Sequence, residues 1–137
     1  MDSVGRFAHR SEDYARFRPT YPPEAIDAIF ADLAAPNTLA AIDVGAGTGI
    51  STRLLAERGA RTIGIEPNGE MRARAAEAGL DVREGDAAHL GLGGASADIV
   101  TAFQAFHWFA GAQTLTEFRR VLKPGGRIAL VWNFFER

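Results

Sequence analysis

Short apolar runs and longer helix-spaced patterns alternate along the 137 residues of this chain. The short runs are bounded by glycine, proline or charged residues, so they predict five β-strands, at 39–44, 62–65, 80–84, 98–103 and 127–132. Helical patterns separate the runs, which favours parallel strands joined by crossover helices. We therefore predict an α/β fold: an open, doubly wound, mostly parallel sheet with strand order 3-2-1-4-5 and helices on both faces.

Residues with strong local preferences mark the predicted helix boundaries. Pro23 and Glu24 suit the first turn of a helix, which the apolar spacing extends to Leu33, before Pro36. Asn68 is a good N-cap for a later helix. The last helix is expected to stop at residues 123–126, whose sequence is Lys-Pro-Gly-Gly. The glycine-rich segment 90–97 predicts a flexible loop.

A turn with three glycines follows the first predicted strand and leads directly into a helix-like segment at 50–58. Glycine tolerates positive φ and lets a ligand approach the backbone closely. Free N–H groups at a helix start favour an anionic or polar ligand. The dinucleotide fingerprint G-x-G-x-x-G/A would place its third position at Ile50, so a nicotinamide-dependent oxidoreductase is the weaker alternative.

This stretch resembles the first motif of class I S-adenosylmethionine-dependent methyltransferases, which has the form acid-x-G-x-G-x-G. The resemblance implies a Rossmann-like fold and S-adenosyl-L-methionine as the cofactor, with its methionine part over the glycine backbone. The residues that it assigns to this part of the site are Asp43, Gly45, Ala46, Gly47, Thr48 and Gly49.

The end of the second strand carries Glu66, 17 residues after the last glycine of the turn. A carboxylate in this position holds a ribose diol in related folds, and the alternative is an ordinary surface glutamate. By resemblance, Pro67 and Met71 lie near the adenine, Asp86 accepts a hydrogen bond from its amino group, and the backbone of Ala87 contacts the ring. On the sequence alone, Asp86 is equally well explained as a turn residue.

The segment after the fourth strand, Gln104-Ala-Phe-His107-Trp108, resembles the trans-aconitate-methyltransferase-like group (methyltransferase type 11). Gln104 is assigned to the cofactor, and Trp108 could face a sulfonium, since aromatic faces attract such cations. A carboxylate acceptor needs no base at neutral pH, whereas a hydroxyl or amine needs one, for which His107 is the candidate. The alternatives are core packing for Trp108 and a structural, hydrogen-bonded role for His107.

The N-terminal segment contains Tyr14, Arg18 and Tyr21, in a string that resembles the segment lying over the pocket in the same group. The resemblance implies a lid, and the alternative is that the aromatic rings pack while the arginines are solvated. We accordingly divide the chain into a lid and helix at 1–38 and a cofactor-binding core at 39–137.

Composition narrows the function classes further. The absence of cysteine excludes disulfides and thiolate chemistry, and three scattered histidines give no metal site. The net charge of −2, with mixed signs, predicts neither a nucleic-acid nor a membrane partner. No apolar run approaches the roughly 18–20 residues of a membrane span, so a cytoplasmic location is expected.

The chain stops after its fifth predicted strand, whereas the sheet of the resembled family normally has a further antiparallel pair. We therefore expect an apolar strand edge that could support a homodimer. The predicted activity is methyl transfer to a small molecule, with a carboxylic acid as one candidate. The alternative is a module that binds the cofactor without transferring its methyl group.

Overall fold

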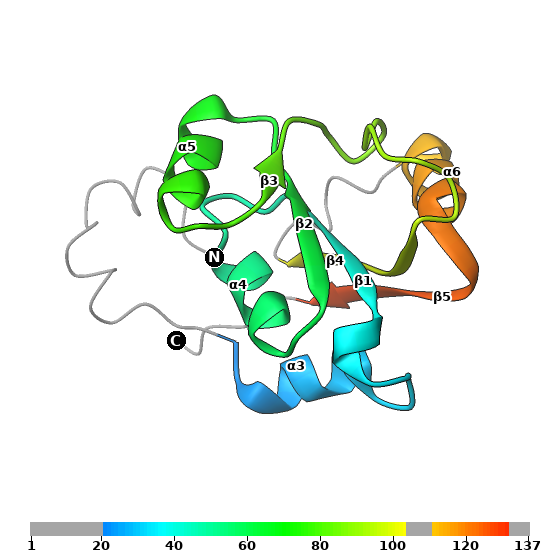
Figure 1. Cartoon of the computed structure of the whole chain (residues 1–137). Coiled ribbons are helices and arrows are strands. Elements are labelled where there is room, and N and C mark those ends of the chain that lie inside the picture. The colour runs from blue at the N-terminus through cyan, green and yellow to red at the C-terminus, as the bar shows by residue number, and fades with distance from the viewer. Residues whose placement is uncertain (1–20, 104–110, 132–137) are drawn as a thin grey trace, which may run out of the picture.

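The computed structural model describes residues 21–103 and 111–131, and these form one five-stranded parallel sheet (Figure 1). Its order, β3-β2-β1-β4-β5, confirms the predicted fold. The strands are β1 (Ala40–Val44), β2 (Arg61–Ile65), β3 (Val82–Arg83), β4 (Ala97–Phe103) and β5 (Leu122–Val131). The predictions for Tyr14, Arg18, Gln104, His107 and Trp108 concern residues outside the described ranges.

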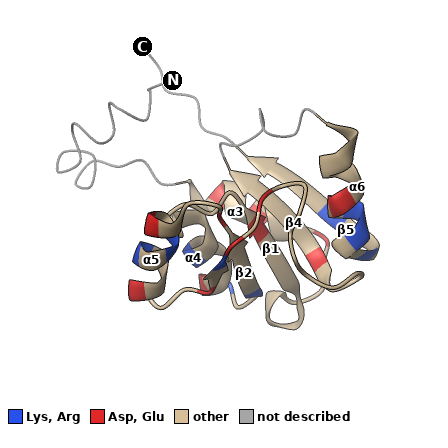
Figure 2. Ribbon diagram, turned by 90° about the horizontal axis from the view of Figure 1, so that it is seen from above, with Lys and Arg blue, Asp and Glu red and all other residues tan. Residues whose placement is uncertain are grey.

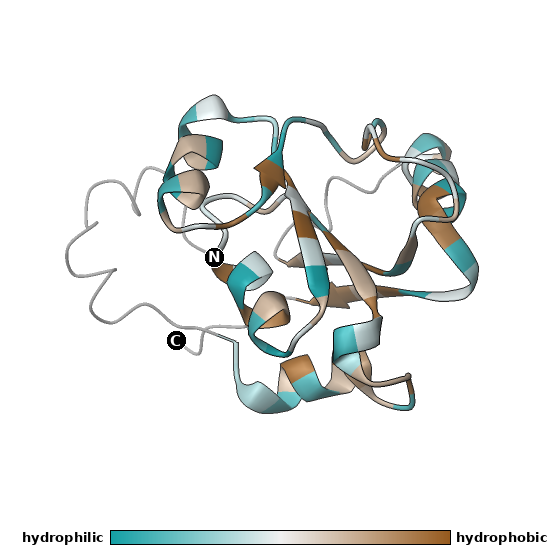
Figure 3. Cartoon of the chain, viewed as in Figure 1, coloured by the Kyte–Doolittle hydropathy of each residue, from teal (hydrophilic) through white to brown (hydrophobic). Residues whose placement is uncertain are grey.

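Two apolar clusters lie on opposite faces of the sheet. The strands contribute alternate residues to each, as a pleated sheet requires: Ala41 belongs to one cluster and Ile42 to the other. The first cluster includes apolar residues of α3 (Pro23–Phe30) and α4 (Ile50–Glu57), whereas the second includes Phe118 and Val121 of α6 (Ala112–Val121). Figure 3 shows the apolar colouring concentrated on the central strands and the polar colouring on the outer sides of the helices.

Helix α3 ends at Phe30, earlier than the apolar spacing predicted. The backbone leaves the helix at Ala31, which is extended, and at Asp32, which has a positive φ of 64°. Arg127 of β5 binds this end, because its Nη1 donates to the carbonyl oxygens of Ile29 at 2.9 Å and Ala31 at 2.7 Å. These carbonyls thus find a partner from another element, as helix ends require. Leu33 lies beyond the helix and still packs against the first cluster. A short 3₁₀ turn, η1 (Pro36–Thr38), then leads into β1.

The other boundaries are closer to the prediction. Asn68 is the N-cap of α5 (Gly69–Glu77), and its side chain accepts a hydrogen bond from the backbone N–H of Met71 at 3.0 Å. Strand β5 begins at Leu122 instead of Arg127, because Leu122 pairs with Ala97 before a register shift in β4. Strand β3 is only two residues long, shorter than the predicted strand at 80–84.

The glycine-rich segment 90–97, which was predicted to be flexible, is hydrogen-bonded to α6. Glu117 Oε2 accepts from the backbone N–H of Leu90 at 2.9 Å, and Arg120 Nη2 donates to the Leu92 carbonyl at 2.7 Å. Two further backbone bonds join Ala95 and Ser96 to the end of the same helix. Composition predicted a loose loop, but hydrogen bonds to a distant helix hold it.

Figure 2 shows acidic and basic residues along the ribbon: they are mixed on α5, while basic residues gather where α6 meets β5. The exposed apolar side chains include Ile128 and Leu130 of β5, and Leu130 is 46% exposed. Strand β5 is the edge of the sheet within the described part of the chain. None of the helices within 21–103 and 111–131 has the length and apolar character needed to cross a membrane.

Candidate functional site

The glycine turn between β1 and α4 adopts the backbone conformation that its sequence predicts. Gly45, Gly47 and Gly49 all have positive φ, at 73°, 60° and 95°. A Cβ on Gly49 would lie 2.5 Å from Leu80 Cδ1 and 3.3 Å from Ala75 Cβ, so the Leu80 side chain would have to move, and the positive φ itself favours glycine. At Gly47, Met71 Sδ at 3.8 Å is the only atom of the described residues within 4 Å of such a Cβ. Among residues 21–103 and 111–131, therefore, no side chain blocks the approach to Gly47.

Glu66 connects the glycine turn to the end of β2. Its Oε1 accepts from the backbone N–H of Gly47 at 2.8 Å, and its Oε2 accepts from the backbone N–H of Asn68 at 3.0 Å. The residue is only 5% exposed. The alternative of an ordinary surface glutamate is therefore wrong, while contact with a ribose stays a prediction.

Met71 lies beside the same turn. It belongs to the first turn of α5, where its backbone N–H is bound by Asn68, and its side chain is partly exposed. Its sulfur is the atom nearest to an imagined Cβ of Gly47. The structure thus brings together Gly47, Glu66 and Met71, three residues that the sequence assigned to the cofactor. Pro67, which directly follows Glu66 in the sequence, is exposed.

Asp43, the acid of the motif, is fully buried at 0% exposure. Its Oδ2 accepts from Ser51 Oγ at 2.7 Å and Thr52 Oγ1 at 2.8 Å, both on the first turn of α4, and its Oδ1 accepts from Thr101 Oγ1 of β4 at 2.9 Å. Burial raises the pKa of the Asp43 carboxyl, and the three hydroxyl bonds act in the opposite direction. Such an enclosed carboxylate supports the turn from behind rather than offering a direct contact to a ligand.

Asp86 forms a turn after β3. Its Oδ1 accepts from the backbone N–H groups of Ala88 and His89, both at 2.9 Å, and lies 3.3 Å from His89 Nδ1. This is the turn chemistry that the sequence left open as an alternative. Its side chain is exposed, whereas Ala87 is buried in the second cluster. The assignment of both residues to an adenine stays a prediction.

Tyr21, the last of the three predicted lid residues, lies at the carboxyl end of β4. Its ring meets that of Phe103 edge to face, and it packs against the first apolar cluster. The carboxyl ends of β1, β2 and β4 are neighbours in the sheet, and in open α/β sheets ligands bind in the crevice outside these ends. Tyr21, the first described residue, therefore lies beside the candidate site.

Sequence reasoning missed four residues that support this site. Ser51, Thr52 and Thr101 enclose Asp43, and their only signal was a hydroxyl at otherwise apolar positions. Gly64 of β2 was taken as an ordinary strand residue. A Cβ there would lie 2.7 Å from Ala46 Cβ and 2.9 Å from Thr52 Oγ1, so Gly64 makes room for the glycine turn and α4.

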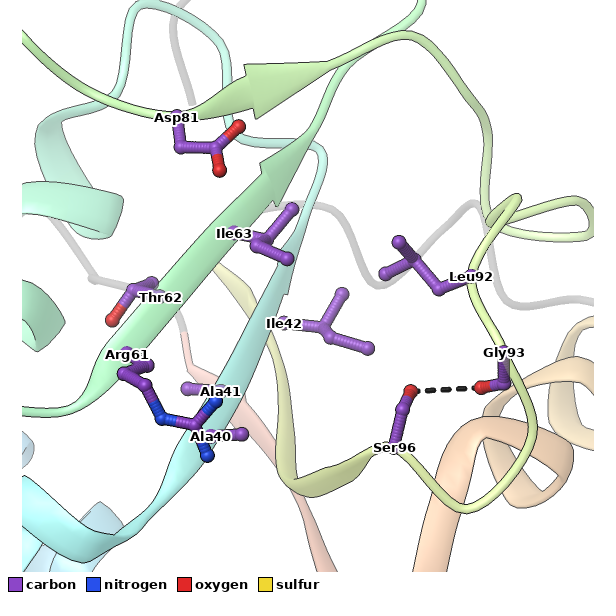
Figure 4. A pocket seen from close by; sticks show the side chains of 10 residues that line it. All are labelled: Ala40, Ala41, Ile42, Arg61, Thr62, Ile63, Asp81, Leu92, Gly93 and Ser96. Carbon is purple, nitrogen blue, oxygen red and sulfur yellow. Dashed lines mark hydrogen bonds between the residues drawn. The ribbon is translucent and has the colours of Figure 1, made fainter.

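A separate hollow of about 490 Å³ lies over the amino-terminal halves of β1 and β2 (Figure 4). The side chains of Ile42, Ile63 and Leu92 point into it, and Arg61 and Asp81 lie at its margin. None of the predicted site residues lines it. The hollow is therefore distinct from the glycine turn, which lies at the carboxyl end of β1.

The sequence is similar to those of known proteins. A family described as methyltransferase domain matches residues 42–130. A Mycobacterium bovis protein named as an uncharacterized methyltransferase is 44% identical over 122 residues, which make up 88% of this chain and 49% of that protein. The chain thus spans about half the length of the curated relatives it matches.

Solved structures of methyltransferases have a similar fold. The crystal structure of an S-adenosylmethionine dependent methyltransferase from Mesorhizobium loti is 27% identical, with a TM-score of 0.65 over 77% of this chain and 52% of that one. A Methanococcus maripaludis structure has a TM-score of 0.72 over 98% of this chain and 68% of its own. At 22% identity, this second likeness shows the fold alone.

Proposed function

The chain belongs to the methyltransferase domain family, and from this premise we propose that it binds S-adenosyl-L-methionine at the glycine turn and transfers the methyl group to a small acceptor. The observation that carries the proposal is the position of Glu66. Its buried carboxylate lies at the end of β2, within hydrogen-bonding distance of the backbone of Gly47. A ribose at Glu66 would leave the rest of the cofactor beside the turn.

The residues present fit this cofactor in three respects. Gly47 leaves space where a side chain would obstruct a ligand. Glu66 offers an acidic acceptor for a diol. Met71 supplies a polarizable apolar side chain beside the turn, and such side chains pack well against aromatic rings. We propose Pro67, Asp86 and Ala87 as the further adenine contacts, and Gln104 as an additional contact with the cofactor.

When bound, S-adenosylmethionine supplies a methyl group on a sulfonium, which is a good leaving group. The chain therefore has to bind and orient two molecules rather than generate a strong nucleophile, and positioning can supply most of the acceleration. The glycine turn and Glu66 fix one partner. Asp43 fixes the turn itself through its bonds to Ser51, Thr52 and Thr101.

We propose a small carboxylic acid as the acceptor, on the basis of the sequence resemblance to the trans-aconitate-methyltransferase-like group. Its carboxylate is already nucleophilic at neutral pH and needs no general base. His107 would act as a base only for a hydroxyl or amine acceptor, and Trp108, Tyr14, Arg18 and Tyr21 are the proposed pocket and lid residues. Transfer of labelled methyl to a panel of acids, alcohols and amines tests this, because a methyl ester is released by alkali while methyl ethers and amines are retained.

Calorimetric titration with S-adenosylhomocysteine tests the cofactor assignment. Glu66→Ala should weaken binding at least about tenfold, since it removes charge-assisted hydrogen bonds. Glu70→Ala is the matched control, because Glu70 is an exposed acid on the first turn of α5. An affinity of Glu66→Ala within twofold of wild type would contradict the assignment.

Gly47→Val tests the turn independently. Gly79→Val is its control, because Gly79 also has positive φ, at 81°, and has nothing within 4 Å of an imagined Cβ. Both variants carry the backbone strain of a β-branched residue at positive φ. Only Gly47→Val should abolish binding of S-adenosylhomocysteine. Equal affinities in the two variants would show that the ligand does not lie on this turn.

Two alternative functions are a nicotinamide-dependent oxidoreductase and a module that only binds the cofactor. Titration with nicotinamide dinucleotides should give no binding, because the third position of their fingerprint is Ile50. A chain that binds S-adenosylhomocysteine but methylates none of the acceptors would act as a binding module. That result would separate cofactor binding from transfer.

We also propose that two copies of the chain associate through β5. Strand edges present unpaired N–H and C=O groups, and this one carries the exposed side chains of Ile128 and Leu130. A two-fold dimer is the commonest closed arrangement for such a surface. Sedimentation at micromolar concentration should show a dimer that Leu130→Lys dissociates, whereas a wild-type monomer would contradict the proposal.

A further inference from the structure

The main chain holds the Glu66 carboxylate at both of its oxygens. Both of its oxygens accept hydrogen bonds from backbone N–H groups, at 2.8 Å from Gly47 and 3.0 Å from Asn68. The nearby cation Arg72 donates to the backbone carbonyl of Glu66 rather than to the carboxylate. Within the described ranges, therefore, two main-chain amides are what stabilise this buried charge.

The two amides belong to different parts of the fold. Gly47 is the middle glycine of the turn after β1, whereas Asn68 is the N-cap of α5, after β2. The neighbouring amides of the turn bind elsewhere: those of Gly45 and Ala46 donate to the Ile65 carbonyl, and that of Gly49 donates to the Ala46 carbonyl. Glu66 is thus the group that holds the centre of the turn, and it does so against the helix that carries Met71.

The carboxylate retains capacity for a ligand. An ionised carboxylate has about four lone-pair sites, two on each oxygen. The two backbone bonds occupy one site on each oxygen. One site on each oxygen is left, which matches the two hydroxyl donors of a ribose diol.

We propose that Glu66 is a positioning residue for the glycine turn as well as a ribose contact. It holds the turn in its binding conformation through its own two backbone bonds, and the diol would add two hydrogen bonds without displacing them. This inference rests on the proposed cofactor site. It predicts that part of the effect of Glu66 on affinity is independent of the ribose, because a turn fixed in advance lowers the cost of binding.

The first test needs no ligand. Hydrogen exchange of the Gly47 and Asn68 amides, measured by NMR, is compared in wild type, Glu66→Gln and the control Glu70→Gln. In Glu66→Gln an NH₂ replaces one of the two acceptor oxygens, so at least one of these two amides should exchange about tenfold faster or more, while Ile42 and Val100 in the sheet are unchanged. A merely structural role would instead speed exchange in the sheet as well, and unchanged exchange at both amides would overturn the proposal.

The second test separates the turn from the ribose. Wild type and Glu66→Gln are titrated with S-adenosylhomocysteine and with its 2′,3′-dideoxy analogue, which has no hydroxyls to bind Glu66. If Glu66 served the ribose alone, the substitution would leave the affinity for the analogue unchanged. We expect the analogue to bind at least about threefold more weakly to Glu66→Gln than to wild type, and a change of less than about 1.5-fold would overturn the proposal.

Glu66→Asp provides the second variant if Glu66→Gln fails to fold. It keeps the charge, but its side chain is one methylene shorter and cannot reach both Gly47 and Asn68 in the same way. Its Gly47 exchange should also be faster than in wild type. Should neither ligand bind to wild type, the proposed function would fail, while the exchange measurement would still decide whether Glu66 positions the turn.

Discussion

The ring of Tyr21 meets the ring of Phe103 edge to face, with centroids 4.8 Å apart and an interplanar angle of 64°. Phe103 is the last residue of β4, so this contact fixes the start of the described chain at the carboxyl edge of the sheet. Tyr21→Leu should lower the free energy of unfolding by about 0.5–1.5 kcal/mol, the value of an aromatic pair beyond its buried area. Urea unfolding measures this, and in a Phe103→Leu background the same substitution should cost clearly less.

Gly64 supports the glycine turn from β2. Because a Cβ would lie within 2.9 Å of Ala46, Thr52 and Val82, Gly64→Ala should destabilise the protein by about 1–3 kcal/mol through overpacking. Gly93→Ala is the control, since it has nothing within 4 Å and no positive φ. Equal midpoints of thermal unfolding for the two variants would refute the role of Gly64.

Thr101 provides one of the three hydroxyls around Asp43. Thr101→Val should cost about 1–3 kcal/mol, because it leaves one oxygen of a buried carboxylate without a donor, whereas Thr101→Ser should be close to wild type. Burial already raises the Asp43 pKa, so this carboxyl favours the folded state most at low pH, and that contribution is lost as pH rises through its folded-state pKa. The penalty of Thr101→Val should therefore be larger at pH 7 than at pH 4, and a penalty that is larger at pH 4 would contradict this account.

Glu117 makes stability depend on pH in the opposite direction. Its hydrogen bonds with Arg120, helped by the Leu90 amide, lower its pKa from 4.5 to about 2. A lowered pKa contributes stability that is complete above 4.5 and is lost as pH falls through about 2. Because Arg120 is 42% exposed, solvent screens this ion pair and its contribution to stability should be small.

Glu117→Gln should remove this dependence. Urea unfolding of wild type and variant at pH 6 and pH 3 should give a difference between them that shrinks at the lower pH. A constant difference would mean that the Glu117 charge does not stabilise the loop–helix contact.

Local patterns were sufficient for the strands, the glycine turn and the Asn68 cap, because each depends on neighbouring residues. The strand order was predicted from general rules for connections in α/β sheets, since β1 pairs with β4 far along the chain. Local patterns were insufficient where a partner is distant in sequence. The end of helix α3 is held by Arg127, which is 98 residues from Ile29. Asp43 is enclosed partly by Thr101, 58 residues away. The bond from Gly47 to Glu66 spans only 19 residues, yet it depends on how β1 and β2 align.

The central strand pair has a consequence for how the chain folds. Asp43 of β1 is paired with Thr101 of β4, 58 residues later in the chain, and α4, β2, α5 and β3 lie between them. Closing so large a loop costs chain entropy before the contacts between β1 and β4 have formed and can offset that cost. Folding is slower as a result. The β1-α4-β2 unit, whose strands are joined by one short helix, can form early, and β4 must then insert beside β1. Refolding should therefore pass through its slowest step when β4 docks, with the glycine turn already assembled.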